Sequence, residues 1–223
     1  MVTEPKIQKI YTEIQRQLFY LIPEKWSKVY LYSSIIEQPG NVETGELYFY
    51  YIPQGILKKN PVNAYEIPSK FSIGETQYLR LIDKLYQEIK QLHKACIEAG
   101  EKKWHSIMIA IADFQFTVEY NYDDLKGSNF NSYERHIIFR YQYLEYPYES
   151  FSKEEKEIIR RYLEESKSKK PNIKTYSEAM YEKPFETIEI GSKHSNIQYV
   201  KDDDIRLLAE KTDFKSQILK SNE

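Results

Sequence analysis

The sequence predicts an α+β fold in which an antiparallel sheet of about four strands is covered by helices packed on one face. Two pairs of short segments alternate between polar and apolar residues, as strands do. Longer segments with apolar residues at every third or fourth position precede, separate and follow these pairs, as amphipathic helices would. The predicted order is therefore α-β-β-α-β-β-α over residues 1–147, followed by a C-terminal helical extension over residues 148–223.

The first pair of strands follows an amphipathic helix. Apolar residues recur at spacings of three and four over residues 5–21, and Pro23 ends this predicted helix. Residues 28–36 and 46–52 then alternate between two faces and should pair as an antiparallel hairpin. One face of that hairpin carries four tyrosines, namely Tyr30, Tyr32, Tyr48 and Tyr50.

The second pair of strands follows a long helix, which the spacing of apolar residues predicts over residues 75–98. Strands are expected over residues 105–112 and 114–122, joined near Asp113. Phe114 begins a series of apolar residues at alternate positions in the second strand. We therefore expect Phe114 on a buried face, while the opposite face of this strand meets water.

Two capping-box patterns mark where the last helices begin. Asn131 with Glu134 precedes a helix of the main unit, and Ser152 with Glu155 opens a charged helix that extends to about residue 167. Pro147, which lies between these helices, is the expected boundary of the main unit.

The sequence after the charged helix differs from the rest. Residues 171–223 contain few apolar side chains, and we interpret them as a partly ordered tail or a small appended element. Three successive aspartates at residues 202–204 precede a last, weak helical pattern, where acidic side chains would favour a helix N-terminus.

Composition narrows the class of protein. The formal net charge is −2, whereas proteins that bind nucleic acid directly usually carry a basic surplus. No apolar run approaches the roughly 20 residues that a membrane-spanning helix needs. Cys96 is the single cysteine, which fits a reducing compartment. We therefore expect a cytoplasmic protein that contacts neither nucleic acid nor membrane directly.

Reactive side chains occur in patterns that have simpler structural explanations. His93 and Cys96 lie three apart on one predicted helix, but no second pair of metal ligands follows, so a core cysteine beside a surface histidine is the better interpretation. The segment Glu101-Lys102-Lys103 fits a solvated turn better than part of a nuclease site. The chain also lacks a glycine-rich phosphate loop. The sequence therefore predicts no catalytic, cofactor-binding or metal-binding residues, and no enzyme.

Tyrosine and local charge favour a protein-binding surface. The chain contains 21 tyrosines, and tyrosine is enriched in interfaces because its ring buries a large area and keeps a polar tip. Residues 104–149 carry seven acidic side chains against three basic ones, which suits a basic partner. The predicted partner-binding residues are Tyr30, Tyr32, Tyr48, Tyr50, Asp123, Asp124 and Glu134.

Several of these segments, in this order, resemble the YezG family of immunity proteins. They are residues 22–32 (IPEKWSKVYLY), 45–51 (GELYFYY), 120–125 (YNYDDL) and 133–144 (YERHIIFRYQYL), and the resemblance covers about residues 5–147. It implies a bacterial, cytoplasmic antitoxin that binds the C-terminal domain of an LXG-type toxin exported by type VII secretion, often a nuclease. Neutralisation would be stoichiometric occlusion, and the family brings no catalytic residues.

The chain departs from the family pattern after Leu144, where the family usually ends and this sequence continues to residue 223. Two other functions stay open. A chaperone-like adaptor would escort a secreted protein without inhibiting it. A small metal-dependent hydrolase would use His105 or His136 together with Asp123 and Asp124.

Overall fold

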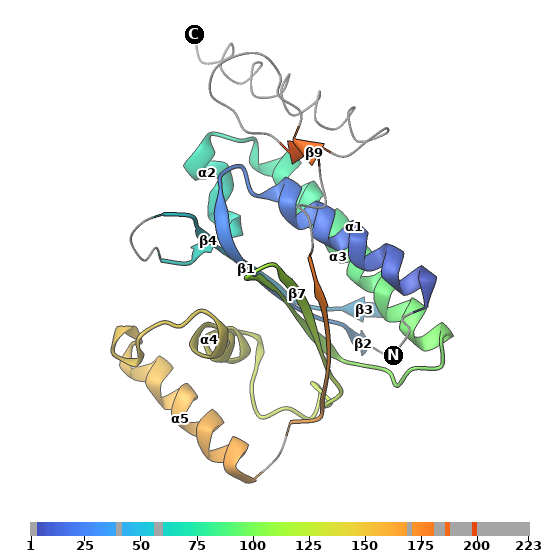
Figure 1. Cartoon of the computed structure of the whole chain (residues 1–223). Coiled ribbons are helices and arrows are strands. Elements are labelled where there is room, and N and C mark those ends of the chain that lie inside the picture. The colour runs from blue at the N-terminus through green and yellow to red at the C-terminus, as the bar shows by residue number, and fades with distance from the viewer. Residues whose placement is uncertain are drawn as a thin grey trace.

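The protein, described here by a computed structural model, has a six-stranded sheet at its centre, in which all neighbouring strands run antiparallel (Figure 1). The structure describes residues 4–38, 42–55, 60–168 and 171–180, and the backbone of residues 186–187 and 198–199. From one edge to the other, the strands are β5 (Val62–Asn63), β4 (Leu47–Pro53), β1 (Trp26–Ser34), β6 (Ser106–Ala112), β7 (Gln115–Asn121) and β8 (Ile173–Ala179).

Two helices cover one face of this sheet. These are α1 (Pro5–Leu21) and α3 (Glu75–Glu98), which lie side by side and bury the apolar stripes that predicted them (Figure 1). Gly100 follows α3 with φ +76°, a left-handed conformation that glycine adopts without steric cost. The main core lies between these helices and the sheet, and its largest fully buried side chains include Trp104, Tyr51, Phe49 and Phe116.

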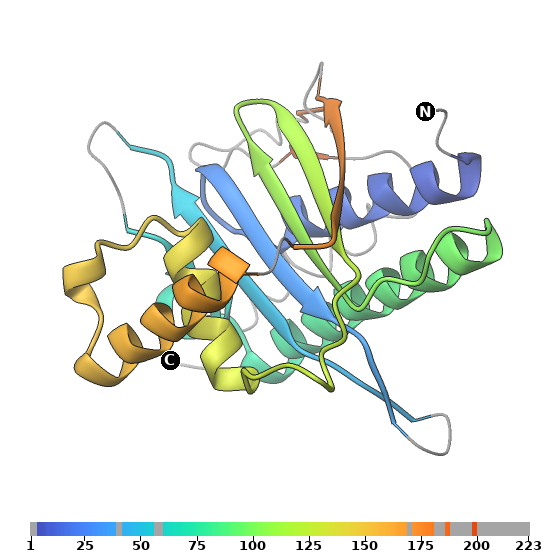
Figure 2. The ribbon, with the colours of Figure 1, turned by 90° about the horizontal axis from the view of Figure 1, so that it is seen from below.

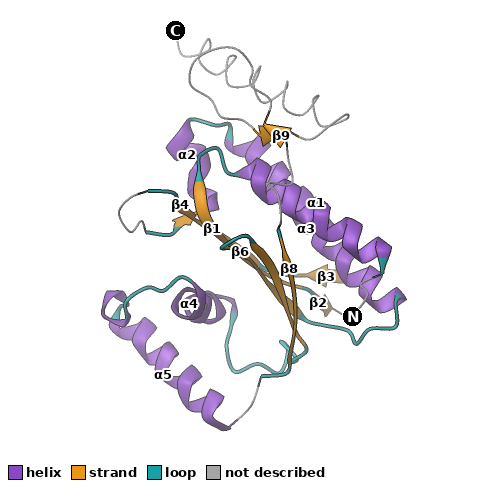
Figure 3. Cartoon of the chain, in the orientation of Figure 1, coloured by secondary structure: helices purple, strands orange, loops and turns teal. Residues whose placement is uncertain are grey.

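The opposite face of the sheet is covered as well. There α4 (Ser132–Tyr143) packs on the strands, and α5 (Lys153–Ser168) packs on α4 (Figure 3). The predicted α+β class and the order of its elements over the main unit are confirmed. Two details differ, since the sheet has six strands and the helices cover both of its faces. The second layer exists because the tyrosine-bearing face of the hairpin is largely apolar and needs its own cover.

The register of the first hairpin confirms the predicted alternation. Tyr30 lies opposite Tyr50 and Tyr32 opposite Tyr48, so all four tyrosines share one face of β1 and β4. On the other face Val29 lies opposite Tyr51 in the main core, and Leu31 lies opposite Phe49. The hairpin therefore presents aromatic rings to both layers of helices.

The turn between β6 and β7 corrects one prediction. Asp113 and Phe114 both have positive φ angles, of 50° and 59°, which matches the tight turn that joins right-twisted strands. Phe114 belongs to this turn and is 78% exposed, so the prediction that it lies on a buried face is wrong. The alternation holds from Phe116 onward, because Phe116, Val118 and Tyr120 are buried.

The region after residue 147 adds to both the helical layer and the sheet. The α5 helix begins at the predicted capping box, in which the Ser152 and Glu155 side chains each accept from the other residue's backbone N–H. The β8 strand then pairs residue for residue with β7, so residues 173–179 are a sheet strand. The domain boundary at Pro147 stays a prediction, and the predicted helix after residues 202–204 lies outside the described residues.

The remaining elements are short. They are β2 (Ile36–Gln38), β3 (Val42–Thr44), the 3₁₀ turns η1 (Ala64–Glu66) and η2 (Tyr148–Ser150), α2 (Ile67–Phe71), and the paired β9 (Glu186–Thr187) and β10 (Gln198–Tyr199). Among the described residues, no helix combines the length and the apolar character needed to cross a membrane.

Gly45 makes the contact between the hairpin and α3 possible, and its replacement should destabilise the fold. The Tyr86 hydroxyl of α3 donates a 3.2 Å hydrogen bond to the Ser34 carbonyl oxygen, and an added Cβ at Gly45 would occupy the space of both oxygens. We expect Gly45→Ala to lower the free energy of unfolding by about 1–3 kcal/mol through overpacking. Urea denaturation measures the change.

Gly127→Ala is the matched control for Gly45→Ala. The nearest atom to a Cβ at Gly127 is Asp124 Oδ2 at 3.6 Å, an ordinary van der Waals distance. We expect this control to stay within about 0.5 kcal/mol of the parent protein. Equal unfolding free energies for the two alanine variants would contradict the proposed crowding at Gly45.

Candidate partner-binding surface

The four predicted tyrosines form one cluster on the sheet. They lie in two cross-strand pairs, and the Tyr32 and Tyr48 rings are stacked with centroids 5.1 Å apart and planes 14° from parallel. Aromatic pairs across neighbouring strands stabilise a sheet because their side chains touch on one face. We call Tyr30, Tyr32, Tyr48, Tyr50 and the α4 residues that contact them the tyrosine cluster.

Phe139 of α4 packs on three of the four tyrosines. Its ring centroid lies 5.9 Å from those of Tyr48 and Tyr50 and 6.2 Å from that of Tyr32. Tyr50 and Phe139 are buried, as is Met108 of β6, while the other three tyrosines are partly buried. The sequence placed these phenol rings at or near the surface. The structure instead places them in a second core, because α4 packs on the face that the prediction left open.

Polar groups of the cluster also attach α4 to the sheet. The Tyr48 hydroxyl donates toward the Ser132 carbonyl oxygen, 2.8 Å away in the first turn of α4. The Tyr50 hydroxyl lies 2.9 Å from Nε2 of His136, and the His136 ring stacks on Tyr48 with centroids 4.4 Å apart. Burial raises the pKa of Tyr50 to about 12, so this phenol stays protonated at neutral pH.

A bidentate ion pair supports the same contact. Arg135 of α4 donates from Nε to Glu46 Oε2 at 3.0 Å and from Nη2 to Glu46 Oε1, and both side chains are largely shielded from solvent. Burial acts to raise the pKa of Glu46, but the hydrogen bonds and charge of Arg135 outweigh it, and this pKa lies below its ordinary value. The carboxylate is therefore charged at neutral pH and fixes the start of α4 beside β4.

The α4 and α5 helices form one unit around a third apolar cluster. The Arg140 guanidinium lies over the rings of Tyr146 and Phe151, 4.9 Å and 5.3 Å from their centroids, and donates to Glu155 at 3.0 Å. Such stacked, charge-paired arginines join apolar packing with a directional bond. The buried side chains of this third apolar cluster are Phe130, Ile137, Ile138, Phe151, Ile158 and Ile159.

Glu134, a predicted partner-binding residue, belongs to this unit. Its carboxylate accepts from the Asn131 backbone N–H at 2.9 Å, which completes the predicted capping box, and pairs with Arg161 of α5. The backbone hydrogen bond from Asn131 holds the pKa of Glu134 below its ordinary value, and Arg161 adds to this effect. Glu134 therefore joins the helices of the unit.

Asp123 and Asp124 lie in the loop that leads from β7 to α4. The Asp123 backbone N–H donates to Asn121 Oδ1 at 2.9 Å, and Asp124 Oδ1 accepts from the Lys126 backbone N–H at 3.0 Å. Asp124 is exposed and Asp123 partly so. Of the seven predicted partner-binding residues, Asp124 is the one that is fully exposed.

The residues considered for metal chemistry do not assemble. Among the described residues, no three His, Cys, Asp or Glu side chains are grouped so as to hold a metal ion. His93 is buried, not at the surface as expected, and its Nε2 donates to the Trp104 carbonyl oxygen at 3.0 Å. Cys96 is buried as expected. His136 belongs to the tyrosine cluster.

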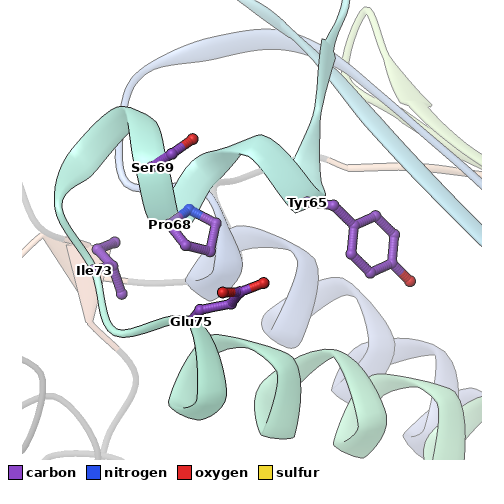
Figure 4. A pocket seen from close by; sticks show the side chains of 5 residues that line it. All are labelled: Tyr65, Pro68, Ser69, Ile73 and Glu75. Carbon is purple, nitrogen blue, oxygen red and sulfur yellow. The ribbon is translucent and has the colours of Figure 1, made fainter.

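A small open pocket lies beside α2 (Figure 4). It brings together one carboxylate and two hydroxyl groups, and one of these hydroxyls, that of Ser69, donates to the Glu66 carbonyl oxygen at 2.9 Å. This lining contains no nucleophile paired with a base. Its residues are Tyr65, Pro68, Ser69, Ile73 and Glu75.

Sequence reasoning missed two exposed tyrosines in the second half of the chain. Tyr133, in the first turn of α4, is 59% exposed, and Tyr148 in η2 is 42% exposed. Helical periodicity gave no signal for the exposure of Tyr133, because Tyr133 precedes Ile137 by four residues and Tyr141 by eight and so falls on the same stripe. The described surface therefore combines an acidic loop with an exposed tyrosine at the start of α4.

These features define an α+β protein whose antiparallel sheet lies between two layers of helices, with an exposed aspartate and an exposed tyrosine where the chain enters the second layer. A family model described as immunity protein YezG-like matches residues 7–159 of the chain. The chain belongs to the YezG-like immunity protein family. The match contains the tyrosine cluster and the loop before α4, and it ends within α5, so β8 lies beyond it.

Individual relatives agree with this family. The chain is similar to immunity protein YezG of Bacillus spizizenii, with 28% identity over 141 residues that make up 63% of this chain and 83% of the relative. It is also similar to immunity protein YezG of Bacillus subtilis, with 26% identity over 142 residues, or 62% of this chain and 87% of the relative. A third relative is type VII secretion system protein EsaG of Staphylococcus aureus, with 29% identity over 149 residues, or 64% and 83%.

His136 should make the stability of the fold depend on pH. Burial lowers the pKa of His136 below its ordinary value, and the charge of Arg140 lowers it further. In the unfolded chain His136 binds a proton near pH 6.5, whereas in the folded chain it stays neutral to lower pH. The free energy of unfolding therefore decreases as pH falls below about 6.5. We expect His136→Gln to lose less stability than the parent over pH 6.5 to 5, measured by urea denaturation.

His93 contributes to this pH dependence in both proteins, because burial lowers its pKa as well. The expected signal is therefore the difference between the two curves, which should grow below about pH 6.5 and level off at lower pH. Curves that stay parallel over this range would show that His136 is not held neutral by the cluster.

Proposed function

We propose that this protein is an immunity protein that acts in the cytoplasm and neutralises the C-terminal domain of a cognate toxin exported by type VII secretion. The supporting observation is the family match over residues 7–159, which includes α3, α4 and the tyrosine cluster. Relatives named immunity protein YezG and type VII secretion system protein EsaG point to the same role. Binding and occlusion of the toxin would suffice for this role, and the immunity protein would need no catalytic activity.

Local charge supports a nuclease-type toxin of the LXG class as the partner. Two of the three basic residues between residues 104 and 149 are paired inside the chain, Arg135 with Glu46 and Arg140 with Glu155. Acidic side chains of this segment, among them Asp113, Asp124 and Glu149, are exposed. A domain that cleaves nucleic acid presents a basic groove to phosphates, so an acidic surface complements it and speeds association.

We place the contact at the loop after β7 and the start of α4. Asp124 is exposed in this loop, and Tyr133 stands exposed where the loop enters the helix. An exposed aromatic anchor with an acidic rim is the arrangement that tight protein inhibitors commonly use. The tyrosines Tyr30, Tyr32, Tyr48 and Tyr50, with Glu134, would support this contact by fixing the position of α4.

Toxicity and complex formation test the proposal together. A candidate toxin domain is sought in the gene beside this one and is expressed with and without the immunity protein. We expect growth to be restored and a complex of fixed stoichiometry to be recovered. We expect Tyr133→Ala to weaken the complex about tenfold and Asp124→Asn to weaken it roughly threefold, as expected for an anchor and a rim charge.

Asp83→Asn is the matched control, since it removes the same charge from an exposed position on α3, in the other helix layer. We expect it to leave affinity unchanged. A toxin that stays lethal and forms no complex would overturn the proposal. A stable complex without protection would favour the adaptor function.

A further inference from the structure

Among the described strands, β8 forms one edge of the sheet. No described strand pairs with its outer side, because β8 ends the sheet and β7 is its only neighbour. The Met180 N–H donates to the Phe114 carbonyl oxygen at 2.7 Å, and the Tyr122 N–H donates to the Asn172 carbonyl oxygen at 3.0 Å. Even-numbered residues of β8 therefore bond to β7. The backbone groups that point outward belong to Ile173, Thr175, Ser177 and Ala179.

Within β8 this edge has neither a proline nor a bulge, and its two charged residues, Lys174 and Glu178, are engaged with Glu101 and with Gln8 and Gln15 of the same chain. Sheet edges are commonly blocked by charged side chains, proline or a bulge, which stop another strand from adding to them. The four outward-pointing residues are uncharged and exposed, and β8 pairs with β7 in unbroken register. The edge is therefore a template for one more strand.

The inward-facing contacts of β8 hold this template in place. Lys174 Nζ lies 2.6 Å from Glu101 Oε2, and Glu178 accepts from the side-chain amides of Gln8 and Gln15 in α1 at 2.8 Å and 2.9 Å. Tyr176 stacks on Tyr11 of α1, with centroids 4.8 Å apart. A strand fixed in this way loses little further entropy when it pairs.

We propose that β8 pairs antiparallel with β8 of a second copy of this chain, which joins the two sheets into one. The sequence of the strand, IKTYSEA, is complementary to itself in this arrangement. When the pairing is centred on Tyr176, Lys174 lies opposite Glu178 of the second copy, Thr175 opposite Ser177, and Ile173 opposite Ala179. Every outward-pointing N–H and C=O then meets a partner.

Charge selects this register among the symmetric ones. A shift of two residues in either direction leaves an outward-pointing residue at one end unpaired and separates Lys174 from Glu178 of the second copy. Opposite charges on facing residues of two strands are favourable, and like charges there are unfavourable. A second copy of β8, related by a twofold axis, therefore fits this edge better than an arbitrary strand does.

Figure 2 shows β8 at the margin of the sheet away from α4 and α5. The sheet face beside it carries small polar groups, including the Thr117 and Ser177 hydroxyls, which lie 3.0 Å apart. The proposed contact uses the backbone of β8 and not the side chains of Asp124 or Tyr133, so it stands independently of the proposed immunity function.

Charge exchange between two variants of the full chain tests the pairing. In Lys174→Glu or Glu178→Lys alone, like charges face each other at two symmetric positions, and we expect dimer affinity to fall roughly tenfold. In an equimolar mixture of the two variants, opposite charges face each other again. We expect the mixture to form heterodimers with nearly parental affinity, measured by sedimentation velocity.

The mixture also controls for folding, because each variant carries the same intramolecular losses alone and in the mixture. Hydrogen exchange gives a second readout. The Thr175 and Ser177 amides should become protected as concentration rises, while the Lys174 and Tyr176 amides are protected throughout. A parent chain that stays monomeric up to about 1 mM would overturn the proposal. A dimer that neither variant weakens would also overturn it. Hydrogen-exchange protection of the β8 amides that appears only when the toxin domain is added would do the same.

Discussion

Burial of the tyrosine cluster between the sheet and α4 is the interaction on which the second half of the molecule depends. The hairpin of β1 and β4 carries aromatic rings on both faces, so one layer of helices cannot cover it. Full burial of a large apolar side chain contributes about 1.5–3 kcal/mol, whereas an exposed ion pair contributes about 1 kcal/mol or less. Phe139 and the tyrosine rings, more than the surface charges, therefore hold α4 in place.

The polar groups of the cluster determine how α4 sits. The Glu46–Arg135 pair and the hydroxyl of Tyr48 fix the first turn of α4 beside β4. Their removal would cost more than their presence contributes, because a lone charge or hydroxyl would remain shielded from water. This fixed first turn carries Tyr133 and follows the loop of Asp124, so packing in the core positions the proposed contact surface.

Local pattern in the sequence predicted most of the elements. The period of apolar residues located α1 and α3, and the capping boxes at Asn131 and Ser152 located α4 and α5. Alternation placed the four tyrosines on one face but could not say what covers that face, because this depends on a helix about 80 residues later. The position of Phe114 was predicted wrongly because the alternating pattern of the strand continues into the tight turn without a break in the sequence. The β8 strand was not predicted because its residues are mostly polar and show no apolar alternation.

Hydrogen exchange of α4 in a Phe139→Ala variant tests most directly whether the cluster holds the second layer of helices. Truncation of a buried phenylalanine costs about 3–5 kcal/mol. If the cluster is what secures α4, the amides of α4 and α5 should lose far more protection than those of α3 and β6, since the layer opens while the main core stays closed. Equal loss of protection in all four elements, or unchanged protection of α4, would contradict this account.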